Sequence, residues 1–281
     1  RQTFQEASGA LGYDLWELIQ NGPAEALNST DKTQPALLTS GVALWRLWQQ
    51  RGGARPDFLA GHSLGEYTAL VCAGVFNLGD GVRLVEKRGQ FMQQAVPAGT
   101  GAMAAILGLD DDQVRAACAA AAEGDVVEAV NLNAPGQVVI AGSVAAVERG
   151  IAACKAAGAK RAMALPVSVP SHCALMKPAA EQLAEVLAGM VLHAAELPVI
   201  NNVDVAMETD SSQIRDALVR QLYSPVRWVE TVQKLSAQGV SRAYECGPGK
   251  VLSGLVKRID KDMRVFALEN ADAFNQALGE A

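Results

Sequence analysis

The sequence predicts an α/β protein in which a small subdomain is inserted into a larger domain. Half of the 281 residues are hydrophobic but only 5% are aromatic, so the core must consist mainly of Ala, Val, Leu and Gly, as in many α/β proteins. Apolar segments of strand length also alternate with segments of helix length. We therefore expect a large α/β domain over residues 1–97 and 169–281 and a small subdomain over 98–168.

The first hundred residues are expected to be mainly helical. Residues 3–19 predict a helix that Gly12 interrupts. A second helix is expected to begin at Thr33, because Pro35 then lies near the first helical position, and to end at the two glycines that follow Arg51. A short buried strand over 56–60 and helices over 64–73 and 80–94 are expected next.

The pattern changes at a Pro- and Gly-rich stretch over 97–101. From there the sequence predicts the β-α-β-β-α-β order of a ferredoxin-like unit, with residues 133–136 joining the two middle strands. Its position in the middle of the chain indicates an insertion. The expected elements are strands at 102–109, 126–131, 137–141 and 161–167 and helices at 111–122 and 144–157.

The last third of the chain returns to helices separated by short strands. Residues 242–246 are expected to be a final buried strand and 265–268 an edge strand. The other expected elements are a strand at 197–202 and helices at 174–189, 214–222, 228–237 and 251–259.

Residues 61–65 fit the G-x-S-x-G pattern of a nucleophile elbow between an expected strand and an expected helix. There Gly61 and Gly65 flank Ser63 on a strained turn, where any Cβ is expected to collide with neighbouring backbone. The turn would expose the Ser63 hydroxyl and point the Leu64 N–H at the same reacting atom. The context favours a nucleophile, with a plain turn serine as the alternative.

A serine nucleophile needs a base, and the chain has three histidines. His172 follows Ser63 in the chain and lies on a loop at a strand end, where α/β active sites collect. The alternative for His172 is a loop histidine bonded to backbone. His62 adjoins the serine and is expected to line the pocket, and His193 is expected to be a surface or capping residue.

The groups that would complete the site stay open at this level. Asp204 and Glu245 are within reach of a histidine by topology only, and a backbone carbonyl could orient the base instead. Arg88 lies on a helix face beside Met92 and is either solvated or turned inward. An inward Arg88 would bind a substrate carboxylate through two parallel hydrogen bonds, with Met92 lining the same pocket.

The composition argues against several classes of function. A net charge of −6 is wrong for general nucleic-acid binding. Five dispersed cysteines without C-x-x-C spacing indicate a reducing compartment and no metal site. No apolar run reaches the ~20 residues of a membrane span, no signal peptide is visible, and residues 247–250 lack Walker spacing. We expect a cytoplasmic monomer that does not bind nucleic acid, membrane or metal.

Five short segments, taken together, carry a family resemblance over nearly the whole chain. In order they are residues 61–67 (GHSLGEY), 88–93 (RGQFMQ), 133–137 (NAPGQ), 166–172 (PVSVPSH) and 244–249 (YECGPG). Chance would not place all five in this order. The chain thereby resembles the bacterial malonyl-CoA:acyl-carrier-protein transacylases of type II fatty acid synthesis.

The resemblance implies an α/β-hydrolase-like large domain with a ferredoxin-like insertion. It implies that Ser63 accepts the acyl group, that His172 acts as base and then as acid, and that Arg88 binds the malonyl carboxylate. It also implies that the main-chain carbonyl of Gln221 orients the histidine, and that the Leu64 N–H is an oxyanion donor.

One segment typical of the family lies outside this sequence. The family begins with a strand and a Gly-Gln-Gly-Ser-Gln loop, whose glutamine N–H is a second oxyanion donor beside that of Leu64. For a chain without that segment we expect loss of a core strand and of one donor. The lost donor would cost on the order of 3 kcal/mol of transition-state stabilisation.

The expected function is ping-pong transfer of malonyl from malonyl-CoA to the phosphopantetheine thiol of acyl carrier protein, through malonyl-Ser63. No cofactor is expected, because the CoA thioester is a substrate. Carrier protein is acidic, so Lys160 with Arg161 and Lys257 with Arg258 are candidate docking pairs, with ordinary exposed charge as the alternative. A serine hydrolase or thioesterase and a non-catalytic carrier-binding module remain open as other functions.

Overall fold

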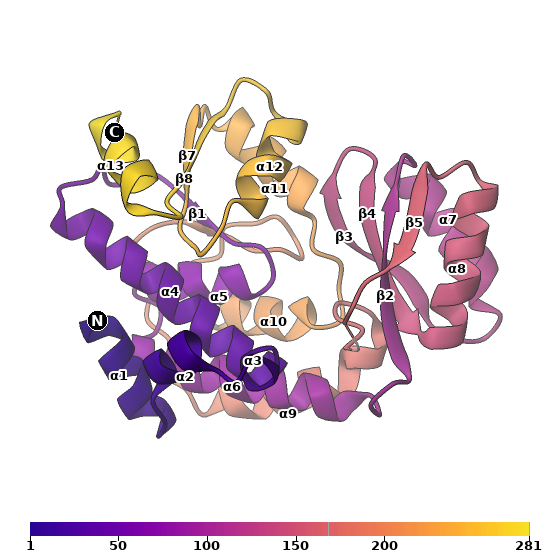
Figure 1. Ribbon diagram of the computed structural model, residues 1–281, viewed down its shortest axis with the longest axis horizontal. Helices are drawn as coiled ribbons and strands as arrows, with labels where there is room; N and C mark the ends of the chain where they lie inside the picture. Colours follow the sequence, from indigo (N-terminus) through magenta and orange to yellow (C-terminus); the bar gives the residue numbers. More distant parts are fainter. Residues whose placement is uncertain (168, 281) are drawn as a thin grey trace.

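The computed structural model describes residues 1–167 and 169–280 and consists of a large body with a smaller one beside it (Figure 1). Ser168, which falls in a motif segment and at the expected subdomain boundary, lies outside the described residues, as does Ala281. The large body consists of short strands surrounded by helices and contains the first and last helices of the chain. The smaller body, at the right of Figure 1, is a sheet covered by two helices.

The smaller body has the element order that the sequence predicts. Its strands form one antiparallel sheet in the order β3-β4-β2-β5. Asp110 and Gln113 start the first helix with a capping box, in which each side chain bonds the other residue's backbone N–H. Apolar residues such as Ile106 and Ile140 form a core between sheet and helices. The elements are β2 (Gly101–Leu107), α7 (Asp111–Ala122), β3 (Val127–Ala134), β4 (Gln137–Ser143), α8 (Val144–Ala156) and β5 (Arg161–Ala164).

The first part of the large body is helical, as predicted, but one helix begins earlier than expected. Ser29 already accepts hydrogen bonds from the backbone N–H groups of Lys32 and Thr33. A first turn therefore forms ahead of Pro35, which lies inside the helix. The elements are α1 (Gln2–Leu11), α2 (Leu15–Asn21), α3 (Ala24–Leu27), which was not predicted, and α4 (Thr30–Gln50).

Strands of the large body form two short parallel pairs. β1 (Leu59–Ala60) pairs with β6 (Val199–Ile200), and β7 (Arg242–Glu245) pairs with β8 (Arg264–Ala267). β1 and β7 line the same cavity of about 410 Å³, which Trp48 and Trp228 also line. The strand predicted at residues 242–246 is present as β7, but the expectation that it is buried is wrong, because it lies beside this cavity, half-buried and with Arg242 exposed.

The remaining helices surround these strands. They are α5 (Leu64–Cys72), α6 (Leu78–Ala95), a short 3-10 turn η1 (Ala174–Met176) leading into α9 (Lys177–Ala188), α10 (Ser211–Gln221), α11 (Trp228–Ala237), α12 (Val251–Ile259) and α13 (Ala271–Gly279), the last of which was not predicted. The main apolar core lies among α1, α4, α5, α6 and α9. Among the described residues, no helix is both long and apolar enough to cross a membrane.

Candidate active site

The serine turn has the strain that a nucleophile elbow needs. Ser63, between β1 and α5, has φ 52° and ψ −108°, which a non-glycine residue adopts only when its surroundings impose it. A Cβ added at Gly61 would lie 1.9 Å from the carbonyl carbon of Gly65, so position 61 requires glycine. The same prediction for Gly65 is wrong, because a Cβ there meets no atom within 4 Å. Leu64 opens α5, so its N–H has no partner within the helix.

His172 is hydrogen-bonded to Ser63. Its Nε2 lies 2.8 Å from Ser63 Oγ, and its Nδ1 lies 2.7 Å from the main-chain oxygen of Gln221, at the end of α10. A carbonyl oxygen only accepts hydrogen bonds, so the ring proton belongs on Nδ1. Nε2 is then the acceptor for the Ser63 hydroxyl proton, as a general base requires.

Neither candidate acid contacts His172. Asp204 is paired with Arg220 at 2.7 Å. Glu245 accepts hydrogen bonds from the N–H groups at the start of α12, including that of Ser253 at 2.7 Å. The backbone carbonyl therefore takes the place of an acidic third member. In the described part of the chain, no three His, Cys, Asp or Glu side chains gather as a metal site.

The surroundings of His172 keep its ring neutral. The ring is buried, and the Arg88 guanidinium lies nearby. Burial, with the arginine's charge as the second cause, lowers the pKa of His172 to about 3. The histidine is therefore ready to accept a proton at neutral pH, and its charged form must be stabilised as the reaction proceeds.

Arg88 is turned inward, and only 2% of its surface is exposed. One terminal nitrogen lies 3.2 Å from Ser63 Oγ and 3.0 Å from Gln221 Oε1, and the other lies 2.7 Å from Gln34 Oε1. None of the ion pairs in the described part of the chain includes Arg88. Its Nε is also buried without a partner there. A buried cation with an unused donor beside a nucleophile is suited to binding an anionic group.

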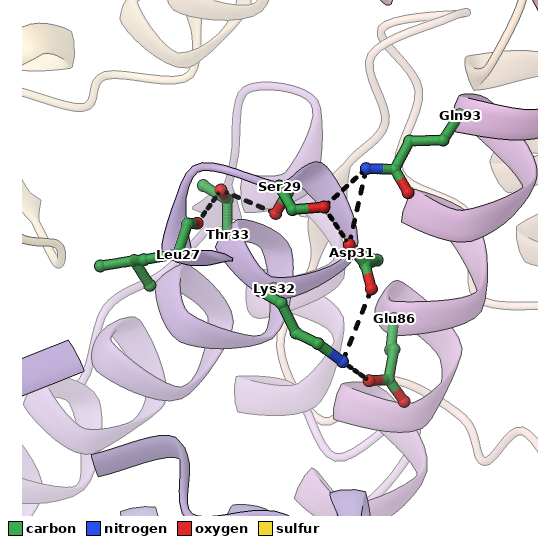
Figure 2. A network of polar contacts seen from close by, with 7 residues as sticks. All are labelled: Leu27, Ser29, Asp31, Lys32, Thr33, Glu86 and Gln93. Atoms are coloured by element: carbon green, nitrogen blue, oxygen red, sulfur yellow. Dashed lines mark hydrogen bonds and ion pairs between the residues drawn. The ribbon is translucent and has the colours of Figure 1, made fainter. Parts of the chain in front are cut away.

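Contacts between α4 and α6 fix the position of this arginine. Figure 2 shows the start of α4 joined to α6 by the hydrogen bond from Gln93 to Ser29 (2.8 Å) and by the ion pair of Lys32 with Glu86 (2.7 Å). A Cβ added at Gly89 would lie 2.5 Å from the Cα of Asp31, so the two helices touch beside Arg88. Arg88 therefore projects from a helix, α6, that contacts with α4 hold in place.

Comparison with known proteins identifies the family. The sequence matches the acyl transferase domain over residues 4–264. It is 65% identical over 277 residues to the malonyl CoA-acyl carrier protein transacylase of Salmonella typhimurium, covering 99% of this chain and 90% of that protein. The chain belongs to the malonyl CoA-acyl carrier protein transacylase family.

Solved structures of family members share the mixed α/β fold. An acyl carrier protein S-malonyltransferase from Vibrio cholerae is 62% identical, with a TM-score of 0.96, over 98% of this chain and 90% of that one. A malonyl-transacylase in complex with its type II PKS acyl-carrier protein is 57% identical, with a TM-score of 0.98, over 100% of this chain and 91% of that one.

His62 and Met92, the expected pocket residues of this family member, lie on different elements. His62 Nε2 is 2.8 Å from Asn133 Oδ1 on β3, and its ring centroid is 5.6 Å from that of Trp228. His62 thus connects the elbow to the smaller body. Met92 is buried one turn after Arg88 on α6. His193 is exposed, as predicted.

Three buried polar residues of the site were not predicted. Asn202 holds both sides of the elbow: its Oδ1 accepts from the Ser63 N–H and its Nδ2 donates to the Gly61 carbonyl, at 2.7 Å each. Gln34 accepts a hydrogen bond from Arg88 itself, and Glu66 accepts one from Gln221, which also contacts Arg88. A sequence signal existed only for Asn202, which follows a strand parallel to the one before the serine, where site residues collect.

Both basic pairs lie beside the turn between β3 and β4. Lys160 and Arg161 are exposed, and a Cβ added at Gly108 would meet the Lys160 side chain at 2.7 Å. Gly108 donates its N–H to the carbonyl of Gly136 in the turn, at 2.9 Å. Arg258 is exposed and follows Lys257 at the end of α12. It donates a hydrogen bond to the carbonyl of Pro135, in the same turn, at 3.1 Å.

Proposed function

We propose that this chain transfers the malonyl group of malonyl-CoA to the phosphopantetheine thiol of acyl carrier protein and so supplies fatty acid synthesis. The observation that carries the proposal is the buried Arg88 guanidinium 3.2 Å from Ser63 Oγ. A malonyl thioester has a carboxylate two bonds beyond the reacting carbonyl carbon, within reach of a cation so close to the nucleophile. An esterase for uncharged acyl groups has no use for it.

The reaction proceeds in two halves through an acyl-enzyme. Ser63 Oγ attacks the thioester carbonyl while His172 Nε2 takes the hydroxyl proton. The Leu64 N–H stabilises the developing oxyanion, the C–S bond breaks, and His172 returns the proton to the CoA sulfur. In the second half, the carrier thiol gives its proton to His172 and attacks the Ser63 ester, and the proton then goes to the departing serine oxygen.

The substrate carboxylate also assists the base. The charge of Arg88 disfavours the imidazolium form of His172 and helps to lower its pKa. A malonyl carboxylate bound to Arg88 offsets that charge. Proton transfer from Ser63 therefore becomes easier when malonyl is in place, so Arg88 selects the acyl group in the chemical step as well as in binding.

The proposal includes an organisation into domains. Residues 1–97 and 169–281 form an α/β-hydrolase-like large domain and 98–168 a ferredoxin-like subdomain, a division supported by their separate apolar cores. His62 and Met92 line the substrate pocket between the nucleophile and the subdomain. The protein acts as a cytoplasmic monomer.

Acyl carrier protein docks beside the turn between β3 and β4. The support is that Arg258 bonds that turn and that Lys160 contacts Gly108, which also bonds it, so each basic pair offers exposed cations to an acidic partner there. Reversing Lys160 and Arg161 to Glu is expected to raise the KM for carrier protein several-fold while leaving the KM for malonyl-CoA unchanged. An unchanged carrier KM would reject this surface.

Mass spectrometry after incubation with malonyl-CoA tests the proposed function. One malonyl adduct is expected on Ser63 and none on the Ser63→Ala variant, and added holo carrier protein should remove the adduct and become malonylated. Absence of an adduct would favour a carrier-binding module. Release of free malonate without carrier protein would favour a hydrolase.

A further inference from the structure

Glu66 is a buried carboxyl that the reaction steps above leave unused. It lies on α5, three residues after Ser63, and only 2% of its surface is exposed. Burial raises its pKa to about 7. A carboxyl removed from water in this way destabilises the fold unless hydrogen bonds offset the lost hydration. The hydrogen bonds of Glu66 therefore indicate what the residue does.

The spacing of Ser63 and Glu66 fits a helix-capping box, but the two residues do not form one. The Ser63 hydroxyl bonds His172, and the Ser63 N–H bonds Asn202 Oδ1. Glu66 Oε2 instead accepts from the backbone N–H of Asn202 at 2.9 Å and from Gln221 Nε2 at 2.8 Å. The carboxyl therefore reaches away from its own helix, to the loop after β6 and to the end of α10.

The surroundings of the Gln221 amide allow only one of its two orientations. Its Nε2 donates to Glu66 Oε2 at 2.8 Å and to the Ser63 carbonyl at 3.1 Å. Its Oε1 accepts from Arg88 at 3.0 Å, and a guanidinium has only donors. A flipped amide would place its NH2 against the arginine and its oxygen against two oxygens. Glu66, which makes the shorter of the two Nε2 bonds, holds the amide against this flip.

We propose that Glu66 is a positioning residue for the carboxylate-binding arginine: it holds the Gln221 side chain so that the amide oxygen meets Arg88. The inference rests on the proposed function and deepens it. A neutral amide oxygen holds the guanidinium without cancelling its charge, whereas a carboxylate placed directly on Arg88 would compete with the substrate. Because the main-chain carbonyl of Gln221 orients His172, one residue then connects the base to the substrate-binding cation.

Three substitutions separate this role from a general structural one. Glu66→Met removes the acceptor at similar volume, whereas Glu66→Gln keeps an acceptor oxygen. Gln221→Met removes the amide but keeps the main-chain carbonyl that bonds His172. Glu185→Gln, on an exposed position of α9, is a control for the loss of one negative charge, and Gln213→Met, exposed on α10, is a control for the loss of one amide.

Two reactions of Ser63 are compared for each variant, with thermal melting as the measure of folding. The first is malonyl transfer, with kcat and KM for malonyl-CoA. The second is modification of Ser63 by phenylmethanesulfonyl fluoride, which has no carboxylate and so reports the serine and its base without a carboxylate contact to Arg88. The malonyl kcat/KM divided by the sulfonylation rate therefore measures the contribution of the arginine.

Glu66→Met and Gln221→Met are expected to raise the KM for malonyl-CoA and to lower this ratio tenfold or more. Glu66→Gln is expected to stay within threefold of the wild type. The double variant with Met at both positions should show no further fall in the ratio, because both substitutions act on the same contact to Arg88.

Two results would overturn the proposal. Equal losses in both reactions would mean that Glu66 only supports the elbow, and a Glu66→Gln variant as poor as Glu66→Met would mean that charge matters and amide orientation does not. If Glu66→Met does not fold, an unchanged ratio in Gln221→Met overturns it alone. Failure of the wild type to form malonyl-Ser63 is a separate result that would reject the proposed function itself.

Discussion

The smaller body and the candidate active site bury opposite kinds of side chain. The core of the smaller body, between its sheet and helices α7 and α8, consists of apolar residues. At the candidate active site six polar or charged residues are buried and joined by hydrogen bonds of their side chains, namely Gln34, Glu66, Arg88, His172, Asn202 and Gln221. Packing of apolar side chains stabilises the smaller body, whereas hydrogen bonds of defined direction hold the candidate site together.

This difference decides what a substitution does. In an apolar core the loss of a few methyl groups changes stability and leaves distant geometry in place. In a buried polar network the loss of one member leaves its partner without a hydrogen bond and lets neighbouring side chains move. We therefore expect substitutions in the small subdomain to act on folding and substitutions in the catalytic network to act on the reaction.

The largest effect is expected for His172→Ala. Without the base, Ser63 keeps its proton, and kcat should fall by roughly 10⁴-fold or more. The melting temperature should fall only modestly, because the variant loses a buried neutral ring and its two hydrogen bonds. Steady-state transfer from malonyl-CoA and thermal denaturation measure the two. A variant that retained a tenth of the activity would contradict the assignment of His172 as base.

Arg88→Ala is expected to have the next largest effect. Removing charge-assisted hydrogen bonds worth ~1.5–3 kcal/mol each should lower kcat/KM for malonyl-CoA by roughly 10³-fold, while transfer from acetyl-CoA rises relative to it. Arg83→Ala, at an exposed arginine of the same helix that pairs with Asp80, is the matched control. Equal losses for the two acyl groups would show that Arg88 does not read the carboxylate.

Ile140→Ala should show the opposite behaviour in the small subdomain. Ile140 is fully buried between sheet and helices, so its truncation should lower the free energy of unfolding by about 2–5 kcal/mol. The kcat of the folded protein should stay within twofold of wild type. Urea unfolding with activity assays tests both, and Met163→Ala, at an exposed residue of β5, is the control. A large fall in kcat would show that the two regions are not independent.

The same difference explains how well each region could be predicted. Helix α7 was predicted at residues 111–122, where the structure has it, because its capping box and its apolar spacing are local. The β-α-β-β-α-β order of these elements along the chain was also predicted. In the large body, strands predicted over 56–60 and 197–202 shrink to two residues each, because their hydrogen bonds depend on a partner about 140 residues away in the chain.

That Ser63, His172 and Arg88 lie together could be predicted, but most of the residues that support them could not. Ser63 lies in a local motif, and His172 and Arg88 follow from the chemistry that a serine nucleophile and an acidic acyl group require. The contacts of Asn202 and Glu66 span 139 and 155 residues of sequence. The place of Asn202 after a predicted strand was a signal for its position but not for these contacts.

The smallest expected effect concerns the pH dependence of stability. Burial raises the pKa of Glu66 to about 7 from an ordinary value of 4.5, so the folded protein holds this proton more tightly than the unfolded chain. Stability from this group is therefore full below pH 4.5, falls as the pH rises toward 7, and changes little above 7. The total change is at most on the order of 3 kcal/mol.

Comparing the wild type with Glu66→Gln isolates this contribution, because His172 and all other titrating groups are present in both. The free energy of unfolding of the wild type minus that of the variant should fall between pH 4.5 and 7 and then level off. The same difference taken with Glu185→Gln, at an exposed carboxyl, should be nearly flat by comparison. A difference that rises with pH would mean that the folded state prefers the carboxylate. In that case Arg88 would stabilise Glu66 as an ion through Gln221, and the catalytic network would hold a buried ion pair in place of a neutral acid.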